Sequence, residues 1–506
     1  MKCLRRPRIR IEGRLPRAIL AVALGLTALG LGIALYFYFF PRPGRIVPPA
    51  AIAVPAHRRV LVLAPHSDDE TLGAGGFIAE AVRHGDEVRV VVATNGDGFR
   101  YAVEDEYHHL RLTPAQYIQF GYVRQKETLA ALALLGVPAD KVSFLGYPDR
   151  GLARLWLDNW SNAKPYTSPY TRVAHSPYLN SLTPGAPYSG ESLLADLEKV
   201  LIDYRPDIII MPHPNDAHPD HWALNAFATY ALADLRHKGW PFAQAPAVYL
   251  YLVHRGDWPA PKGVHLNGRL TPPTTLADTT TAWSSLSLSP DVIRLKYQAI
   301  LTYKSQLAIM RRFLTSFARS NEIFGELGEI PAPPVPDGRI RVTGTPSEWA
   351  GIEPIVRDPT LDTVARRIEG SGDLQALYAA VDSSHLFLLL QTRRPVSNKL
   401  TYTVRLIPFD QAASPYRHQV IVRIRPPSRV NLVNPFEQEV PGGTQVVVKA
   451  NRDFIELSLP LWAIGSPRRV YLSAETSLSE LMIDRLAWQM VRLEPTKVLS
   501  PWPGGR

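Results

Sequence analysis

The sequence predicts an α/β domain with a parallel sheet, preceded by one transmembrane helix and followed by a β-sandwich domain. Three observations lead to this expectation. Residues 18–40 form an uncharged apolar run, strand-like and helix-like segments alternate over residues 57–330, and short alternating strands without a helical pattern fill residues 338–506. Strands and helices that alternate with short connections are typical of Rossmann-like sheets. A proline-rich linker at residues 331–337 separates the two folded regions.

The composition is that of a globular protein with two or more domains. The chain has 506 residues, of which 46% are hydrophobic and 20% charged, an ordinary balance for packed cores. Of the net charge of +10, the basic tail at residues 1–17 supplies +6. Elsewhere no basic stripe is interleaved with aromatic residues, which argues against nucleic-acid binding. The single cysteine, Cys3, excludes internal disulfides and cysteine-based metal sites.

Residues 18–40 are long enough to cross a bilayer as a helix. Five aromatic residues, 36–40, end the run and resemble an interfacial belt. A cleaved signal peptide is the alternative, but its apolar region would be shorter, with a small-residue cleavage site directly after it. We therefore expect an uncleaved signal anchor in the cell membrane. The basic tail keeps the N-terminus cytoplasmic and sends the linker 41–56 and everything after it outside the cytoplasm.

The segment Arg59–Glu70, with the sequence RVLVLAPHSDDE, is the centre of the predicted α/β domain. An unbroken aliphatic run that ends at a breaker is typical of a strand buried on both faces. His66, Asp68 and Asp69 follow this strand, at the carboxyl end where open α/β sheets place their ligands. Burying titratable side chains costs free energy unless they are compensated. A divalent metal ion would compensate them.

A second buried-strand pattern, Asp207–Met211, ends in a segment that contains His218 and His221. At this i, i+3 spacing both imidazoles can face one point from the first turn of a helix. Two strands that each deliver histidine and aspartate at their ends provide a mixed nitrogen and oxygen ligand set. Such sets suit zinc, and three protein ligands that leave a fourth position open are the catalytic arrangement.

The remaining elements follow in order. Further strands of the α/β domain are predicted at residues 87–94, 142–145 and 247–253, with helices at about 71–84, 114–135, 192–203, from the HPDH segment to 235, and 291–306. The glycines of 73–76 do not have the spacing of a dinucleotide-binding turn, so we expect them to allow close helix–sheet packing. In the C-terminal domain, strands are predicted at 374–380, 386–391, 401–407, 419–425, 445–449, 455–459 and 470–474.

The two polar boxes, PHSDDE at residues 65–70 and HPDH at residues 218–221, resemble those of the PIG-L/LmbE-like family of zinc-dependent N-acetylglucosaminyl deacetylases. The resemblance covers residues 57–320, about half of the chain. Ser67 departs from the family, which usually has proline there, but this position contributes no ligand. The resemblance implies a Rossmann-like catalytic domain that acts on an N-acetylated amino sugar.

The resemblance also implies roles for individual residues. His66, Asp69 and His221 correspond to ligands of Zn²⁺. Asp68 corresponds to the general base that deprotonates the metal-bound water, and His218 to the group that stabilises the oxyanion or protonates the leaving amine. Spacing alone leaves open which of the two adjacent aspartates binds the metal. The alternative to a metal site is that the histidine after the strand is structural and that the acidic residues are there because they favour a helix N-terminus.

Three further positions are candidates for the substrate pocket. Arg124 matches an Arg-x-x-Glu helix motif of the family that is associated with substrate contact, and a solvated helix face is the alternative. Asp149 matches an aspartate after the third strand that resembles a sugar-hydroxyl acceptor, and turn stabilisation is the competing interpretation. Residues 95–98, with the sequence NGDG, are expected to shape the pocket floor or to form a tight turn.

Two regions suggest carbohydrate contacts outside the catalytic boxes. The long insertion at residues 153–190 contains six Trp and Tyr residues, which predicts a lid or an extended glycan subsite, with packing onto the domain as the alternative. The C-terminal sandwich resembles family-9-type carbohydrate-binding modules at Ser347–Trp349, Gly372–Leu374 with Tyr378, and Asp382. A packing domain without a ligand is the alternative.

Together these features predict a membrane-anchored, extracytoplasmic, zinc-dependent deacetylase that hydrolyses the N-acetyl group of an N-acetylglucosamine-type sugar in a glycan or glycolipid. A sandwich that binds sugar would raise the local substrate concentration. A metal-dependent amidase with a non-sugar substrate and a surface-tethered glycan-binding protein without catalysis are the two rival hypotheses.

Overall fold

The computed structural model divides into two units, Met1–Arg45 and Ile46–Arg506. The predicted tail 1–17 and the predicted span 18–40 lie almost entirely outside the described residues. Within the described part of the chain, no helix combines the length and apolar character needed to span a bilayer. The described residues are 47–494 except Leu110, Asp257, Asp278, 360–369, 410–418 and 441–442, together with Gly25, Thr27, Leu29 and Gly30.

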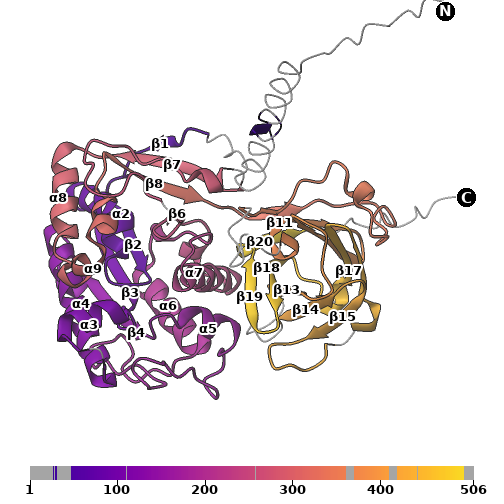
Figure 1. Cartoon of the computed structure of the whole chain (residues 1–506), viewed down its shortest axis with the longest axis horizontal. Coiled ribbons are helices and arrows are strands. Elements are labelled where there is room, and N and C mark those ends of the chain that lie inside the picture. The colour runs from indigo at the N-terminus through magenta and orange to yellow at the C-terminus, as the bar shows by residue number, and fades with distance from the viewer. Residues whose placement is uncertain are drawn as a thin grey trace, which may run out of the picture. The chain divides into compact units, whose positions relative to one another are not determined.

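The α/β domain is built on one mixed sheet, which has eight strands over the described residues. Its order is β1-β7-β8-β6-β5-β2-β3-β4, and β6, β5, β2, β3 and β4 run parallel (Figure 1). The strands are β1 Ala50–Ile52, β2 Arg59–Ala64, β3 Glu87–Thr94, β4 Val142–Tyr147, β5 Ile208–Pro212, β6 Ala247–Tyr251, β7 Ala282–Ser287 and β8 Asn321–Glu326. The predicted parallel sheet is therefore confirmed at the centre, where β2 and β5 are almost wholly buried.

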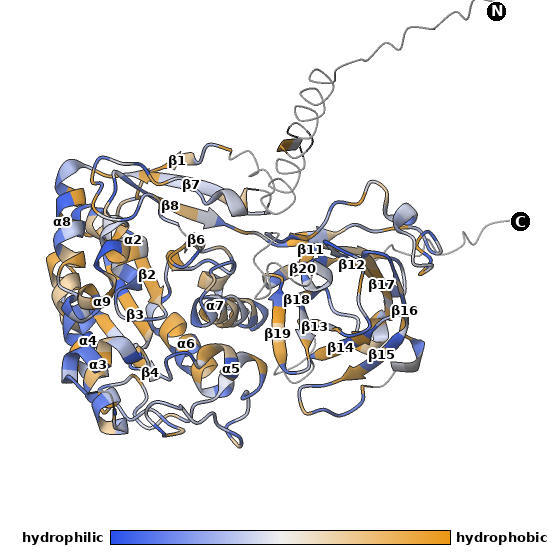
Figure 2. Cartoon of the chain, viewed as in Figure 1, coloured by the Kyte–Doolittle hydropathy of each residue, from blue (hydrophilic) through white to orange (hydrophobic). Residues whose placement is uncertain are grey.

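Helices cover both faces of this sheet and create two apolar cores. One core joins α2, α4, α8 and α9 to the sheet, and the other joins α5, α6 and α7. Figure 2 shows the central strands β2 and β3 as hydrophobic between more polar helices. The helices are α2 Asp69–Arg83, α3 Arg100–Tyr107, α4 Pro114–Leu134, α5 Leu152–Leu157, α6 Gly190–Tyr204, α7 Pro219–His237, α8 Pro290–Ile300 and α9 Lys304–Thr315.

The structure differs from the sequence prediction in several elements of this domain. The expected helix at 291–306 is two helices, because α8 ends at Ile300 and α9 begins at Lys304. The strands β1, β7 and β8 were not predicted, and β1 lies within the predicted linker 41–56, where it pairs with β7. The strand β8 runs antiparallel to both β6 and β7. β7 (AWSSLS) is rich in serine, and β8 (NEIFGE) mixes polar residues and a glycine with few aliphatic ones, so both lack the aliphatic run that marks a buried parallel strand.

The aromatic insertion is mostly a packing element. Trp156, Trp160, Tyr178 and Tyr188 are at most 6% exposed, so these four side chains cannot offer open faces to a sugar. Trp156 and Trp160 belong to the core formed by α5, α6 and α7. For these residues the packing alternative is correct, and the predicted glycan subsite is wrong.

The C-terminal domain consists of two sheets around one apolar core, in agreement with the predicted β-sandwich. One sheet has the order β10-β11-β12-β17-β16 and the other β15-β14-β13-β18-β20-β9, with β19 paired to β18. The strands are β9 Ile330–Ala332, β10 Val356–Arg357, β11 Leu374–Val381, β12 His385–Thr392, β13 Thr401–Phe409, β14 Val420–Arg425, β15 Arg429–Val433, β16 Val447–Asn451, β17 Phe454–Pro460, β18 Arg469–Leu478, β19 Leu481–Arg485 and β20 Gln489–Leu493. Because β9 pairs with β20, the predicted linker 331–337 begins inside this domain.

The sandwich and the α/β domain share a core. Phe409, Tyr471 and Trp488 of the sandwich belong to the same apolar cluster as residues of α5 and α7. The rings of Trp156 and Trp488 meet edge to face with 5.3 Å between their centroids, a favourable aromatic geometry. This dry aromatic contact explains why residues 46–506 form one compact unit.

Candidate metal centre

The first functional segment is a tight turn between β2 and α2. β2 ends at Ala64, and Asp68, the residue directly before α2, has a φ of 114°, a conformation that residues other than glycine rarely adopt. The turn is held by the backbone N–H of His66, which donates to Asp69 Oδ2 at 3.0 Å. The adjacent side chains meet different partners, since Asp68 pairs with Arg124 and Asp69 meets His66 and His221.

The second functional segment connects β5 to α7 and is fixed by Asp216. Its carboxylate accepts hydrogen bonds from the backbone N–H groups of His218, Val253 and His254, each at 2.9 Å. His218 then caps α7, since its Nδ1 accepts from the Asp220 N–H at 3.2 Å. His221 lies in the first turn of α7, as the sequence predicted.

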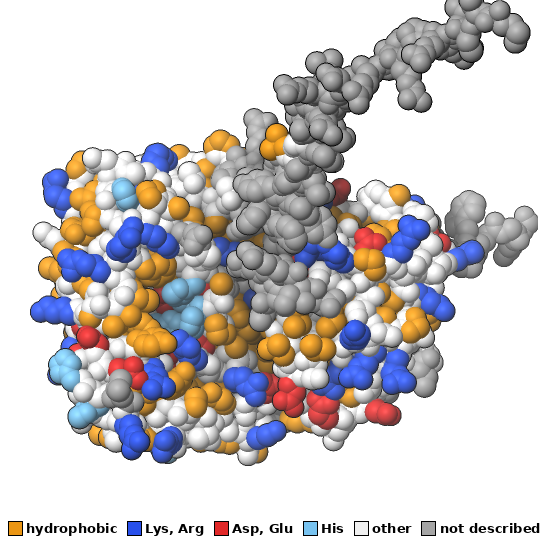
Figure 3. All heavy atoms as spheres, in the orientation of Figure 1, with side chains coloured by type: hydrophobic (Ala, Val, Ile, Leu, Met, Phe, Trp, Pro, Cys, Tyr) orange, Lys and Arg blue, Asp and Glu red, His pale blue; other side chains and the backbone are white. Residues whose placement is uncertain are grey.

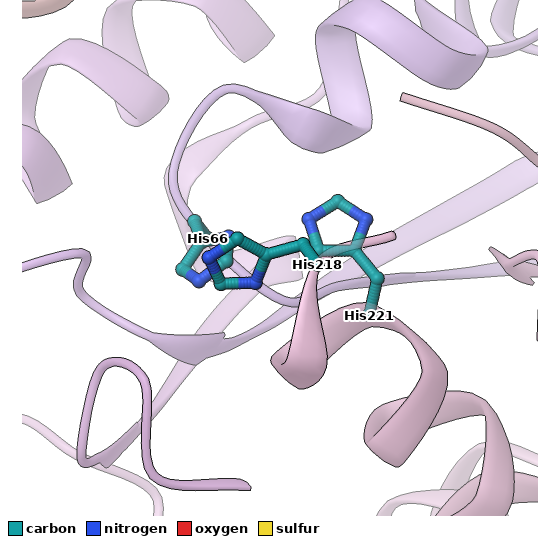
Figure 4. Close-up of side chains that lie close together, drawn as sticks. All are labelled: His66, His218 and His221. Atoms are coloured by element: carbon teal, nitrogen blue, oxygen red, sulfur yellow. The ribbon is translucent and has the colours of Figure 1, made fainter. Parts of the chain in front are cut away.

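The structure brings His66, Asp69 and His221 together. Asp69 Oδ2 lies 3.0 Å from His66 Nδ1 and 3.1 Å from His221 Nε2, and the two rings are 5.3 Å apart between centroids. Bonds of about 2.0–2.1 Å in tetrahedral zinc sites place neighbouring ligand atoms about 3.3 Å apart. Figure 4 shows His66, His218 and His221 close together. In Figure 3 histidine surfaces line a hollow in the face shown.

A fourth histidine, His254, joins the cluster and was missed in the sequence. Its ring centroid lies 4.9 Å from that of His221 and 5.3 Å from that of His218. Asp69, His221 and His254 form one of the groups whose ligand atoms lie within 4.8 Å of one another; the others are His66 with His218 and His221, and His66 with Asp149 and Asp220. His254 follows β6 by three residues, so the rule that ligands gather at strand ends could have identified it.

Two further buried carboxylates support the histidine rings from behind. Asp216 Oδ2 lies 3.2 Å from His221 Nδ1, and Asp220 Oδ2 lies 3.1 Å from His66 Nε2. Asp220 also accepts from the N–H groups of Arg150 and Leu152 at 2.6 and 2.9 Å. Carboxylates in this position orient a ligating imidazole and increase its basicity. Neither residue was singled out in the sequence, although Asp220 is part of the HPDH box.

The electrostatics of the cluster fit a divalent cation. Burial lowers the pKa of His221, but Asp216 and Asp69 outweigh it and raise that pKa to about 9. Burial acts on His66 in the same direction, and Asp149, Asp220 and Asp69 raise its pKa well above the usual value. The protein thus collects carboxylates that favour positive charge on both rings. A cation bound between them would use the same charges and displace the protons, and the nitrogen and oxygen donors suit zinc.

Asp68 lies beside the cluster and is paired with Arg124. Arg124 Nη2 is 3.3 Å from Asp68 Oδ2, and the guanidinium also donates to the carbonyls of Ser67 and Gly96. Burial raises the pKa of Asp68 well above its usual value, and the charge of Arg124 opposes this shift. Arg124 is 4% exposed, so the alternative of a solvated helix face is wrong.

Asp149 links the strand-end loops around His66. Its Oδ2 accepts from the Gly98 N–H at 2.8 Å and its Oδ1 lies 3.3 Å from His66 Nε2. The predicted NGDG segment therefore contacts the site through Gly96 and Gly98. Because the Asp149 side chain bonds to a different loop, local turn stabilisation does not account for it.

His218 is held as a neutral imidazole. Burial and the nearby rings of His66, His221 and His254 lower its pKa well below the usual value. Since Nδ1 accepts a hydrogen bond from the Asp220 N–H, the proton of the neutral ring is on Nε2. His218 can therefore donate a hydrogen bond from Nε2 at neutral pH.

Comparisons with known proteins point to one family for the region that holds the site. Residues 61–232 match the model of the PIG-L family, described as GlcNAc-PI de-N-acetylase. The matched segment contains both boxes, so the predicted resemblance is confirmed for this part of the chain. The resemblance of the C-terminal sandwich to carbohydrate-binding modules stays a prediction.

The chain is similar to 1D-myo-inositol 2-acetamido-2-deoxy-alpha-D-glucopyranoside deacetylases. It is 34% identical to the one from Mycobacterium sp. (strain KMS) over 34% of this chain and 50% of that protein. It is 28% identical to the one from Tsukamurella paurometabola over 53% of this chain and 88% of that protein. The chain thus spans about half the length of the mycobacterial relative.

Solved structures that match about half of this chain have lower identity. N,N'-diacetylchitobiose deacetylase from Pyrococcus horikoshii is 20% identical, with a TM-score of 0.32, over 53% of this chain and 82% of that one. The 4-carboxy-2-hydroxymuconate hydratase GalB from Pseudomonas putida is 18% identical, with a TM-score of 0.33, over 51% and 82%.

The contact between Gly96 and Arg124 generates a first prediction. A Cβ on Gly96 would lie 1.5 Å from Arg124 Nη1, so Gly96→Ala should displace the guanidinium from Asp68 and lower any activity of the site at least tenfold. Gly185→Ala is the matched control, because Gly185 also has positive φ but has no atom within 4 Å of the added Cβ. Both variants should lose about 1–2 kcal/mol from backbone strain. Equal activity in the two variants would contradict this role of Gly96.

The pKa of Asp97 generates a second prediction. Burial and the charge of Asp149 raise this pKa to about 7, against the opposing effects of Tyr178 and Arg124. Because the unfolded-state pKa is about 3.9, the folded state keeps the proton longer, and this residue's contribution to stability falls as pH rises from about 4 to 7. Asp97→Asn should therefore gain about 3 kcal/mol in free energy of unfolding relative to wild type between pH 5 and pH 8, measured by urea unfolding. A difference that does not change with pH would refute the shift.

Proposed function

We propose that this protein is a metal-dependent N-deacetylase that hydrolyses the N-acetyl group of an N-acetylglucosamine-type sugar in a glycan or glycolipid. One observation carries the proposal. Asp69 meets His66 and His221 within about 3 Å, beside the buried Asp68, in a segment that matches a de-N-acetylase family. The deacetylases among the relatives support the reaction class and the type of sugar.

The metal would be held by His66, Asp69 and His221, with Zn²⁺ as the cation that suits these donors. When bound, such an ion polarises an acyl carbonyl and lowers the pKa of a water molecule. His254 lies next to Asp69 and His221 and closes the cluster on the side of β6. Asp216 and Asp220 hold the rings of His221 and His66 in orientation.

Proton transfer would be carried by Asp68. Its carboxylate accepts the proton of the attacking water, and the water oxygen forms a bond to the acetyl carbon. Burial raises the pKa of Asp68, and a carboxylate with a raised pKa is a stronger base than an ordinary aspartate. Arg124 keeps the carboxylate in place through the 3.3 Å ion pair.

His218 would stabilise the transition state. Its Nε2–H donates a hydrogen bond to the oxygen on which negative charge develops, and a donor already fixed in orientation costs little to reorganise. The carbon–nitrogen bond then breaks, and the proton taken up by Asp68 passes to the leaving nitrogen. The products are acetate and a free amino sugar.

We also propose that residues 18–40 anchor the enzyme in the cell membrane, with the catalytic domain outside the cytoplasm. The uncharged apolar run and the basic tail before it support this arrangement. If the sandwich binds glycan, it does so away from the residues of β13, β18 and β20 that are buried against the α/β domain.

The experiment that tests the function is an acetate-release assay with the full chain and N-acetylglucosamine-containing glycans and glycolipids. Asp68→Asn should reduce kcat by about 10²–10⁴-fold while the protein keeps its metal, because Asp68 is not among the proposed ligands. Asp140→Asn, an exposed aspartate of the same domain, should have wild-type activity.

Two results would overturn parts of the proposal. Full activity of Asp68→Asn would exclude this residue as the base. If the protein hydrolysed non-sugar amides but released no acetate from amino sugars, the result would support the metal-dependent amidase hypothesis and refute the proposed sugar substrate.

A further inference from the structure

The β-sandwich places one arginine side chain against the segment that connects β5 to α7 and against the first turn of α7. Arg485, the last residue of β19, stacks its guanidinium over the ring of Trp222 at 4.2 Å from the ring centroid. Its Nη2 also donates to the carbonyl of Pro214 at 3.3 Å, and its Nη1 donates to the carbonyl of Leu486 at 2.9 Å. A single side chain therefore contacts two points of the α/β domain.

These two points flank the segment that carries the functional residues. Pro214 lies two residues before Asp216, and Trp222 directly follows His221. Asp216 in turn faces His221 Nδ1 at 3.2 Å. A shift of the backbone at either end would change the distance between Asp216 and His221, and with it the orientation of the His221 ring.

The guanidinium is well suited to hold both ends at once. Its planar face stacks on an aromatic ring while its edge donates hydrogen bonds in fixed directions. A lysine ammonium can approach the ring but cannot keep the same fork of donors. Trp222 is 7% exposed, and such burial strengthens the attraction between cation and ring.

The attachment of the sandwich makes Arg485 a fixed part of the site. Met490, Trp488 and Tyr471 of the sandwich are at most 7% exposed and belong to the core of α5 and α7. The ring of Phe409 in β13 lies 5.3 Å from that of Tyr230 in α7. Because these apolar contacts hold the two domains together, loss of Arg485 would leave the fold intact.

We propose that Arg485 is a positioning residue of the metal centre, through which the β-sandwich fixes the orientation of His221. The C-terminal domain is thereby a part of the catalytic unit and not a module tethered by a linker. The proposal rests on the proposed function for its effect on turnover. Its effect on metal affinity does not depend on the substrate.

The test compares Arg485→Ala and Arg485→Lys with wild type in the full chain. Metal affinity is measured by competition for Zn²⁺ with a chromophoric chelator, stability by thermal unfolding, and kcat and KM by acetate release. Arg485→Ala should bind Zn²⁺ about tenfold more weakly, as expected when the support of a metal ligand is lost. Arg485→Ala should also lower kcat with little change in KM. Arg485→Lys should lie between wild type and Arg485→Ala in both Zn²⁺ affinity and kcat.

Arg469→Ala is the matched control. Arg469 of β18 lies 3.2 Å from Glu329, which also pairs with Arg236 in the last turn of α7 at 2.6 Å. Arg236 is roughly 22 Å along the helix from His221. The control therefore removes a contact near the other end of the same helix, and it should lower the Tm without changing Zn²⁺ affinity.

The outcomes separate the two proposals. The positioning role would be overturned if both Arg485 variants bound Zn²⁺ within twofold of the wild-type affinity. It would also be overturned if Arg469→Ala lost as much Zn²⁺ affinity as Arg485→Ala. If the wild-type protein binds Zn²⁺ but releases no acetate, the deacetylase function fails while the affinity comparison still decides the role of Arg485.

Discussion

One carboxylate oxygen holds the candidate site together. Asp69 Oδ2 is within about 3 Å of a nitrogen of His66 and a nitrogen of His221, which come from segments about 150 residues apart in the chain. A buried carboxylate and two buried imidazoles are costly unless their charges compensate one another or bind a cation. The order of the parallel strands, with β2 next to β5, is what allows this compensation.

The parts of this arrangement that could be predicted are those with a local signal. The aliphatic runs of β2 and β5 mark buried strands, and ligands gather at the carboxyl ends of such strands. His66 and Asp69 follow the first run within five residues, and His221 lies in the first turn of the helix that comes after the second run. The roles of Asp68 and Asp69 could be separated only by family resemblance, because a φ of 114° at Asp68 is not visible in the sequence.

The parts that could not be predicted depend on contacts between distant residues. His254 directly follows a predicted strand and could have been a candidate on that ground, but the sequence does not show that this strand, β6, pairs with β5 and so brings His254 to the site. Trp156 and Trp488 are apolar side chains that look the same in the sequence whether they meet a sugar or another domain. Their burial in one core shows that the sandwich packs on the helices that support the site.

The measurement that tests the central claim most directly is the metal content of the full chain after dialysis, compared between wild type and His221→Ala. The account predicts about one divalent ion per wild-type chain, and loss of most of it in the variant, since three protein ligands are reduced to two. A variant that retains the wild-type content, or a wild-type protein that binds no divalent metal, would contradict the account.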